Sequence, residues 1–572
     1  MDSTTEQAAG AAQRDKAPLY EMLAQDLKAA GVEAVFGLMS DDTALLATTL
    51  DALGVRFYGA RHENTAIAMA DGYAYAAGRL GVALIGRGPA LANGLHAAAY
   101  ASRTGSPLLL LYGEAATANP PNALGPDYKA FDGVGALRAA GLRTFSATGV
   151  LSARGVLADA ARAAMSGMAV SLHLPTDVQL AEVARSEAGA EAPFASPRAR
   201  KPMPATPQAI AATAALLGNA TRPVIVAGLG AYRAGARQAL AALAVKIGAL
   251  LLSTARGKDL FRGNRNCLGI IGSFSHSLAR GLAEQADCVL VFGAGLNFLT
   301  TSFGTALPAV PLIHVDAVRT HIGRWLRADV AVVGDARLAA EQLTAAVPDR
   351  PASAKPFHTE ETRRLIAAFD PTRDFQPANT ARTLDPRTLA ITLDGLLPPD
   401  RNVIVDGGNF LGVVPYLSVP DPGHFKMIGD FASIGLGFGA ALGVAHARPS
   451  KTTVLVIGDG GLLMTLGELE TVVREGLPLV IIVMNDCAYG AELHFLRLRQ
   501  QPVAKSVFGD VDFAPIARAF GFEATTVRTL EDLQRAAACR RNPEAPLLLD
   551  CKINADVAAP FMSEFAHFEG RH

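Results

Sequence analysis

Two aspartates in the last quarter of the chain have the residue types and neighbours of a metal and phosphate site. Asp459 stands in a Gly-Asp-Gly-Gly turn directly after an apolar run at 454–457. Asp486 follows a second apolar run, at 479–484, and lies 27 positions after Asp459. In a right-handed strand–helix–strand crossover the carboxyl ends of both strands lie at the same edge of a parallel sheet. Carboxylates bind hard divalent cations, and the glycines leave backbone N–H groups free for phosphate oxygens, so this pair predicts a Mg²⁺ and phosphate site.

Two other interpretations of the same turn remain in view. A Gly-Asp-Gly sequence also occurs as an ordinary strand-to-helix turn, with the second aspartate as a loop cap, but the strand-end spacing of the pair weakens that alternative. A dinucleotide-binding turn fits poorly, because no acidic residue ends the next strand where a ribose partner is expected.

The elements that must position these residues can be read along the whole chain. Short apolar runs with little polar alternation recur between Ala-rich stretches of helical length. Such runs are typical of strands buried on both faces, and their alternation with helices is typical of parallel sheets. We therefore expect an α/β protein of mostly parallel sheets flanked by helices. A single helix is expected after Asp459, with an apolar residue at every third position (Leu463, Leu466, Leu469 and Val472) and a stop at Gly476.

Two stretches interrupt this alternation. Residues 186–208 and 349–387 are rich in Pro, Ala and charged residues, a composition typical of linkers. They predict three domains, at 18–185, 206–345 and 386–557, after a loose polar tail at 1–17.

Composition limits the class of protein. The chain has 572 residues, 50% hydrophobic and 18% charged, which excludes disorder and implies well-filled cores. Lys+Arg 52 against Asp+Glu 53 leaves no basic excess for nucleic acid or an anionic membrane. Five scattered cysteines without a paired motif argue against a zinc site or disulfide framework and suit a reducing cytoplasm. No apolar run approaches the length of a membrane span or a signal peptide.

The Gly-Asp-Gly turn followed 27 residues later by an Asn-Asp pair resembles the thiamine diphosphate motif of the acetolactate synthase, benzoylformate decarboxylase and pyruvate decarboxylase superfamily. The resemblance spans about residues 18–557 and implies a pyrimidine-binding, a central Rossmann-like and a diphosphate-binding domain. It implies that Asp459, Asp486 and the carbonyl of Ala488 hold Mg²⁺. Asp486 stands where the motif usually has Asn, and its extra charge should tighten the metal while opposing the diphosphate. By resemblance, thiamine diphosphate would be contacted by Gly408, Asn409, Phe410, Ser433, Ile434, Gly458, Gly460, Gly461, Tyr489 and Gly490.

A second candidate lies near the N-terminus, where Arg61-His62-Glu63 precedes an Ala-rich stretch of helical length. Taken alone, Glu63 could be a charge at the positive end of a helix. The resemblance implies instead the family's activating glutamate, which bonds the pyrimidine ring and promotes removal of the thiazolium C2 proton. It also implies a homodimer or homotetramer with active sites between subunits.

The resemblance further implies addition of the C2 carbanion to a small 2-oxo acid, loss of CO₂ to an enamine, and then ligation or protonation. We expect Asp41, Glu492 and His494 to act in catalysis and Arg87 and Lys129 to line the substrate pocket, although each could be a solvated loop charge. The expected activity is an acetolactate synthase-like carboligase or decarboxylase. The alternatives are a non-ligating decarboxylase, a carbon–carbon lyase or hydrolase, and a catalytically silent cofactor-binding subunit.

Flavin is not expected. Acetolactate synthases usually carry an Arg- and Asp-rich segment after the Gly-Ala-Gly turn at 293–295, and here that segment reads Leu-Asn-Phe-Leu-Thr-Thr. The sequence therefore predicts thiamine diphosphate and Mg²⁺ without FAD.

Overall fold

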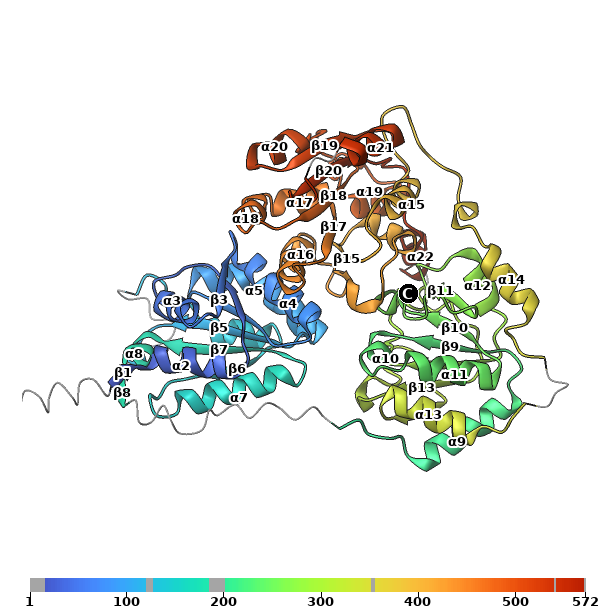
Figure 1. Ribbon diagram of the computed structural model, residues 1–572, viewed down its shortest axis with the longest axis horizontal. Coiled ribbons are helices and arrows are strands. Elements are labelled where there is room, and N and C mark those ends of the chain that lie inside the picture. The colour runs from blue at the N-terminus through green and yellow to red at the C-terminus, as the bar shows by residue number, and fades with distance from the viewer. Residues whose placement is uncertain (1–15, 120–126, 185–200, 351–354, 540–541, 570–572) are drawn as a thin grey trace, which may run out of the picture.

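The computed structural model describes residues 16–119, 127–184, 201–350, 355–539 and 542–569. Within these residues the chain forms three six-stranded parallel sheets, each flanked by helices, which confirms the predicted α/β class. Figure 1 shows the three sheets as separate layers at the corners of a triangle, with the last one above the other two.

The first sheet has the strand order β3-β2-β4-β5-β7-β6. A short antiparallel pair, β1 and β8, brings the two ends of this region together. Its elements are β1 (Lys16–Pro18), α2 (Leu19–Ala29), β2 (Ala34–Gly37), α3 (Ala44–Ala52), β3 (Arg56–Gly59), α4 (Glu63–Ala77), β4 (Gly81–Ile85), α5 (Pro89–Thr104), β5 (Leu108–Glu114), α6 (Gly133–Ala139), β6 (Arg143–Ser146), α7 (Ala153–Met165), β7 (Ala169–Pro175), α8 (Thr176–Leu180) and β8 (Glu182–Ala184).

The central sheet has the order β11-β10-β9-β12-β13-β14. Its elements, with the two that follow it, are α9 (Pro207–Asn219), β9 (Pro223–Ala227), α10 (Leu229–Arg233), α11 (Arg237–Ile247), β10 (Leu250–Ser253), η2 (Ala255–Gly257), β11 (Cys267–Ile270), α12 (Ser277–Ala283), β12 (Cys288–Phe292), β13 (Leu312–Asp316), η3 (Arg319–His321), β14 (Val330–Val333), α13 (Ala336–Ala346), α14 (Glu360–Ala368) and η4 (Pro371–Asp374).

The last sheet has the order β16-β15-β17-β18-β20-β19. Its elements are α15 (Pro386–Leu396), β15 (Arg401–Val405), η5 (Asn409–Tyr416), η6 (Pro422–His424), β16 (Phe425–Met427), α16 (Leu436–Ala447), β17 (Thr452–Gly458), α17 (Asp459–Met464), α18 (Glu468–Arg474), β18 (Leu479–Asn485), α19 (Gly490–Leu498), α20 (Phe513–Phe520), β19 (Glu523–Val527), α21 (Leu530–Cys539), β20 (Leu547–Lys552) and α22 (Pro560–Glu569).

The first and last regions meet through two helices packed at very short distance, α4 and α16, which lie side by side in Figure 1. A Cβ added at Gly72 would lie 2.0 Å from the carbonyl oxygen of Ala440, and one at Gly443 would lie 1.9 Å from that of Met69. Only glycine permits this approach, so the two backbones fix the position of one region against the other.

The single helix expected after Asp459 is wrong: α17 ends at Met464 and α18 begins at Glu468. An apolar residue at every third position drifts around a helix of 3.6 residues per turn and cannot form one face. Accordingly Leu469 and Val472 are buried while Leu463 is exposed.

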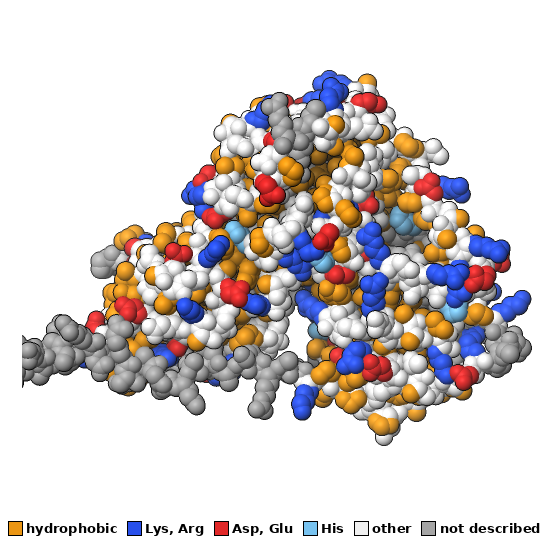
Figure 2. Space-filling view, in the orientation of Figure 1, with side chains coloured by type: hydrophobic (Ala, Val, Ile, Leu, Met, Phe, Trp, Pro, Cys, Tyr) orange, Lys and Arg blue, Asp and Glu red, His pale blue; other side chains and the backbone are white. Residues whose placement is uncertain are grey.

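The surface carries charges of both signs. Figure 2 shows Lys and Arg side chains near Asp and Glu over all three regions of the visible face. Among the described residues, no helix is both long and apolar enough to cross a membrane.

Candidate active site

The two aspartates of the Gly-Asp-Gly motif lie at one edge of the last sheet, as the crossover argument predicts. Strands β17 and β18 are parallel neighbours, with Gly458 paired to Met484. Asp459 begins helix α17 directly after β17, and Asp486 follows β18. Both line the same cavity, which has a volume of about 520 Å³.

Without a bound cation, burial disfavours the ionised form of both carboxyls in this pair. Burial, and then the charge of Asp486, raise the pKa of Asp459 to about 8. Burial raises the pKa of Asp486 to about 7. The described residues contain no group of three His, Cys, Asp or Glu side chains that could hold a metal. A cation bound by this pair would therefore complete its shell with backbone carbonyls, phosphate oxygens or water, which is the usual environment of Mg²⁺.

Glycines around the pair leave room for a ligand with phosphate groups. A Cβ at Gly490 would lie 2.3 Å from Oδ2 of Asp486, and one at Gly460 would lie 2.6 Å from the Tyr489 ring. Side chains at these positions would collide with the walls of the cavity. The acidic pair, with Asp459 buried and Asp486 half-buried, and the glycine turns together fit a diphosphate bound through a divalent metal.

Strained backbone flanks the cavity on both sides. Cys487, between Asp486 and Ala488, has φ 57°, and Ala432 has φ 50°. Non-glycine residues rarely adopt this left-handed region, and such residues concentrate at functional sites.

A buried carboxylate that the sequence reasoning missed holds the opposite wall. Asp406 directly follows β15, and its two oxygens accept the N–H groups of Gly435 (2.6 Å) and Gly437 (2.9 Å). Burial raises the pKa of Asp406 to about 6. The carboxylate fixes the turn into α16 and so the position of Ile434, which faces the cavity. The position of Asp406 at the end of an apolar run and before two glycines was the sequence signal that could have identified this residue.

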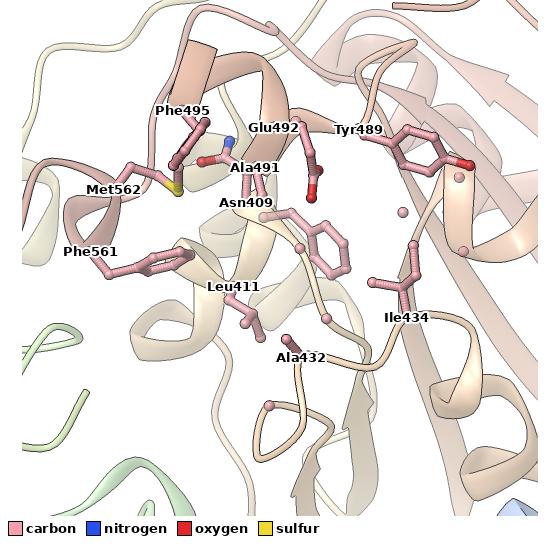
Figure 3. Close-up of a pocket in the computed structure, with 18 of the residues that line it drawn as sticks. Asn409, Leu411, Ala432, Ile434, Tyr489, Ala491, Glu492, Phe495, Phe561 and Met562 are labelled. Carbon is pink, nitrogen blue, oxygen red and sulfur yellow. The ribbon is translucent and has the colours of Figure 1, made fainter. Parts of the chain in front are cut away.

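The cavity is lined by most of the residues expected to contact the cofactor or substrate from the last region. Figure 3 shows Tyr489 and Ile434 on one side of the cavity and Glu492 pointing into it. The lining residues from the expected set are Gly408, Asn409, Phe410, Ile434, Gly458, Asp459, Gly460, Gly461, Asp486, Ala488, Tyr489, Gly490 and Glu492.

Two expected residues of the last region do not reach the cavity. His494 is 5% exposed and is not among the lining residues. Residues 492 and 494 are two positions apart on α19, about 200° around the helix, so only Glu492 of the two faces the cavity, and a catalytic role of His494 stays a prediction. Ser433 is also buried, and its hydroxyl lies 2.9 Å from Nε2 of His96. It therefore fixes the loop that carries Ile434 rather than lining the cavity.

Asn409 lines the cavity, but its side chain is held elsewhere. The Asn409 amide donates to the carbonyl of Val557 (2.9 Å) and accepts the N–H of Ala559 (2.8 Å). Asn409 thus fastens the segment that leads into helix α22.

A separate cluster forms at the carboxyl edge of the first sheet. Glu63 begins α4, is 8% exposed and accepts a hydrogen bond from Asn93 (3.2 Å). The Arg87 guanidinium pairs with Asp127 at 2.6 Å.

Arg87 also lies 3.7 Å from Asp42. Lys129 pairs with Asp41, and the Lys129 side chain lowers the pKa of that carboxyl. The structure therefore brings Asp41, Arg87 and Lys129 together at this edge, and their roles toward the substrate stay predictions.

This cluster and the cavity do not meet within one chain. None of the residues described between 16 and 184 lines the cavity. Within a single chain the candidate acid–base residue Glu63 and the candidate metal ligands thus lie at separate places.

The central sheet reverses its strand order between β9 and β12, where such sheets bind dinucleotides. Here the N–H of Gly230 donates to the carbonyl of Gly293 (3.0 Å), and a Cβ at Gly230 would lie 2.8 Å from Cα of Gly293. The two loops touch at the reversal point. The absence of FAD stays a prediction.

Comparisons with known proteins agree with this arrangement. Family models of thiamine pyrophosphate enzymes match three parts of the chain: the N-terminal TPP binding domain at 18–130, the central domain at 210–343 and the C-terminal TPP binding domain at 406–551. A probable acetolactate synthase large subunit of Methanocaldococcus jannaschii is 26% identical over 95% of this chain and 93% of its own length. A 2-hydroxyacyl-CoA lyase of Oryza sativa is 28% identical over 92% and 94%. A probable 2-ketoarginine decarboxylase of Pseudomonas aeruginosa is 29% identical over 88% of each chain.

Proposed function

Because this chain belongs to the family of thiamine pyrophosphate enzymes, we propose that it decarboxylates a 2-oxo acid and joins the remaining fragment to a second carbonyl compound, as an acetolactate synthase-like carboligase. The observation that carries the proposal is the pair of Asp459 and Asp486 beside glycine turns in one cavity.

In this proposal the last region holds the cofactor. Asp459, Asp486 and the carbonyl of Ala488 bind Mg²⁺, and the glycine turns bind the diphosphate through backbone N–H groups. Ile434 lies on the opposite wall and supports the ring system. When bound, thiamine diphosphate supplies a nucleophilic carbon and an acceptor for the electron pair released as CO₂ leaves.

Glu63 of a second copy completes the site. Its carboxyl is largely buried, contacts Asn93 and starts a helix that is locked against α16 of its own chain. There it holds or shares a proton at the cofactor's pyrimidine ring. Since one chain carries only two half-sites, the active assembly is a homodimer or a homotetramer.

The substrate side of the site combines groups from both copies. Glu492 faces the cavity, where it can hold or deliver a proton. Asp41 reaches the same place from the second copy in its ion pair with Lys129. Arg87 already binds two carboxylates, so it orients this edge of the first sheet.

A non-ligating decarboxylase is the second candidate. The observation that favours it is Glu492 itself, because an acid in the cavity can protonate the decarboxylated fragment before a second carbonyl arrives. The relatives named as a lyase and a decarboxylase are consistent with both outcomes.

A panel of 2-oxo acids tests the proposal. The purified protein is supplied with thiamine diphosphate and Mg²⁺, and CO₂, aldehyde and hydroxyketone are measured together. Ligation gives CO₂ with hydroxyketone, and simple decarboxylation gives CO₂ with aldehyde. If a protein shown by mass spectrometry to hold the cofactor releases no CO₂, the proposal fails in favour of a lyase, a hydrolase or a silent subunit.

A further inference from the structure

The cavity has a second end, away from the acidic pair, whose lining is apolar. Figure 3 shows Phe495, Phe561 and Met562 together on the side opposite Tyr489 and Ile434. Three separate segments build this end: the loop after β12, helix α19 and helix α22. We call it the aromatic wall, and it consists of Phe298, Phe303, Phe495, Phe561, Met562 and Phe565.

Rings of the aromatic wall contact one another. The ring centroids of Phe298 and Phe303 are 5.3 Å apart, and those of Phe303 and Phe565 are 5.8 Å apart. Phe495 lies 6.4 Å from Phe565. These separations are typical of packed aromatic side chains. The loop and the two helices therefore present one continuous apolar surface to the cavity.

The loop that supplies two of these rings is held in a costly conformation. Ser302 has φ 47° and Phe303 has φ 55°, in the left-handed region that bulky residues rarely adopt. The N–H of Phe303 donates to the carbonyl of Phe298 (2.7 Å), which closes the loop. Phe298 nevertheless remains 46% exposed. Strained backbone that places an exposed ring at a cavity is typical of a ligand site.

The charges of the cavity indicate which ligand the wall suits. Among the described lining residues, the charged side chains are Asp459, Asp486 and Glu492, and the first two belong to the candidate metal site. Glu492 lies between the two ends, and the wall itself has neither an acid nor a base. An anionic group seated on the wall would lose its hydration without gaining a partner.

We propose that the aromatic wall binds the side chain of the 2-oxo acid, and that this side chain is large and uncharged, either aromatic or branched aliphatic. The inference rests on the proposed function and narrows its substrate class. The binding free energy that an apolar side chain contributes increases with the apolar area that it removes from water. The methyl group of pyruvate offers little such area. Because one methylene changes kcat/KM by about 10–200-fold in an apolar pocket, we expect phenylpyruvate and 4-methyl-2-oxopentanoate to exceed pyruvate by at least about 10-fold.

The first experiment measures kcat/KM for CO₂ release by the protein loaded with thiamine diphosphate and Mg²⁺. The substrates are pyruvate, 4-methyl-2-oxopentanoate, phenylpyruvate and 5-guanidino-2-oxopentanoate. Phe298→Ala alters an exposed loop side chain, so the fold should be retained. It should lower kcat/KM for phenylpyruvate about 10-fold and for pyruvate less than about 2-fold. Phe520→Ala is the matched control, because Phe520 is 37% exposed on α20 and does not line the cavity, and it should change neither value.

The second experiment needs no turnover. Calorimetry compares the binding of 3-phenylpropanoate with that of acetate, and Phe298→Ala should weaken only the former. A preference for pyruvate or for the guanidino acid overturns the inference and leaves decarboxylation standing. If none of the four acids releases CO₂, the proposed function fails. In that case, binding of 3-phenylpropanoate that depends on Phe298 still supports the aromatic wall as a ligand site. If 3-phenylpropanoate does not bind in this way, the inference about the wall is overturned as well.

Discussion

Glu468 is expected to hold Glu63 in place, although the two residues lie in different regions of the chain. Glu468 is 1% exposed on α18, and its Oε1 accepts the backbone N–H of Arg61 at 3.0 Å. Its Oε2 accepts the hydroxyl of Thr471 at 2.6 Å. Arg61 precedes Glu63 by two residues, so the carboxylate of Glu468 anchors the strand-to-helix turn that presents the candidate acid–base group.

Glu468→Ala removes both hydrogen bonds and leaves the N–H of Arg61 without this acceptor. Each hydrogen bond to a charged group contributes about 1.5–3 kcal/mol to stability. Part of this lost stability is regained in the variant, because a carboxylate no longer has to be desolvated on folding. We expect the free energy of unfolding to fall by about 2–4 kcal/mol. If about 1.4 kcal/mol of this loosens the turn in the folded state, the equilibrium constant between the anchored turn and a loosened one falls about 10-fold.

Two measurements check this prediction. Urea unfolding gives the loss of stability, and deuterium exchange at the thiazolium C2 under saturating Mg²⁺ reports the action of Glu63. Glu470→Gln is the matched control, since Glu470 lies on the same helix and pairs with the exposed side chain of the same Arg61 at 2.6 Å. A surface pair of this kind contributes about 0.2–1 kcal/mol, so exchange should stay within about 2-fold. Wild-type exchange in Glu468→Ala, or equal slowing in both variants, would refute the reasoning.

Three further predictions concern the site and its frame. Asp459→Ala should abolish thiamine diphosphate binding in calorimetry with Mg²⁺, and undiminished affinity would remove Asp459 from the metal site. Glu63→Gln should leave the cofactor bound while turnover and C2 exchange fall about 10²–10⁴-fold, so equal exchange rates would exclude the acid–base role. His446 lies against Tyr58 with ring centroids 3.7 Å apart and ring planes tilted by 30°, and burial, followed by the charges of Arg474 and Arg56, lowers the pKa of His446 to about 4. Because that value is below the unfolded one of about 6.5, stability should fall as pH drops from 6.5 towards 4, by about 2 kcal/mol at pH 5, and His446→Phe should flatten this slope in urea unfolding.

Some of the site could be predicted because it depends on short segments. The meeting of Asp459 and Asp486 follows from one strand–helix–strand crossover, which places the ends of neighbouring parallel strands at the same edge. The α/β class follows in the same way from buried apolar runs that alternate with helical stretches. The placing of Glu63 at the start of a helix follows from the Ala-rich stretch behind it.

The tertiary structure decided which side of each helix faces the cavity and which distant segments contact one another. Glu492 and His494 differ by two positions, yet only the turn at which α19 begins determines which of them faces the cavity. The apolar residues at every third position after Asp459 predicted one helix and did not show the break before Glu468. Which of these residues are buried depends on the neighbouring elements and not on their spacing in the sequence.

The walls of the cavity were beyond the reach of sequence reasoning for the same reason. Asp406 is significant only because a loop about thirty residues later turns its N–H groups towards it. The aromatic wall joins side chains from the central region, from α19 and from α22. Its first and last members in the sequence, Phe298 and Phe565, are more than 260 positions apart. The sequence by itself determined the chemistry at the ends of two adjacent strands. There, a short strand–helix–strand segment is enough to bring the two aspartates to the same edge of the sheet. Packing between regions decided which side chains complete the cavity, because such contacts leave no periodic pattern in the chain.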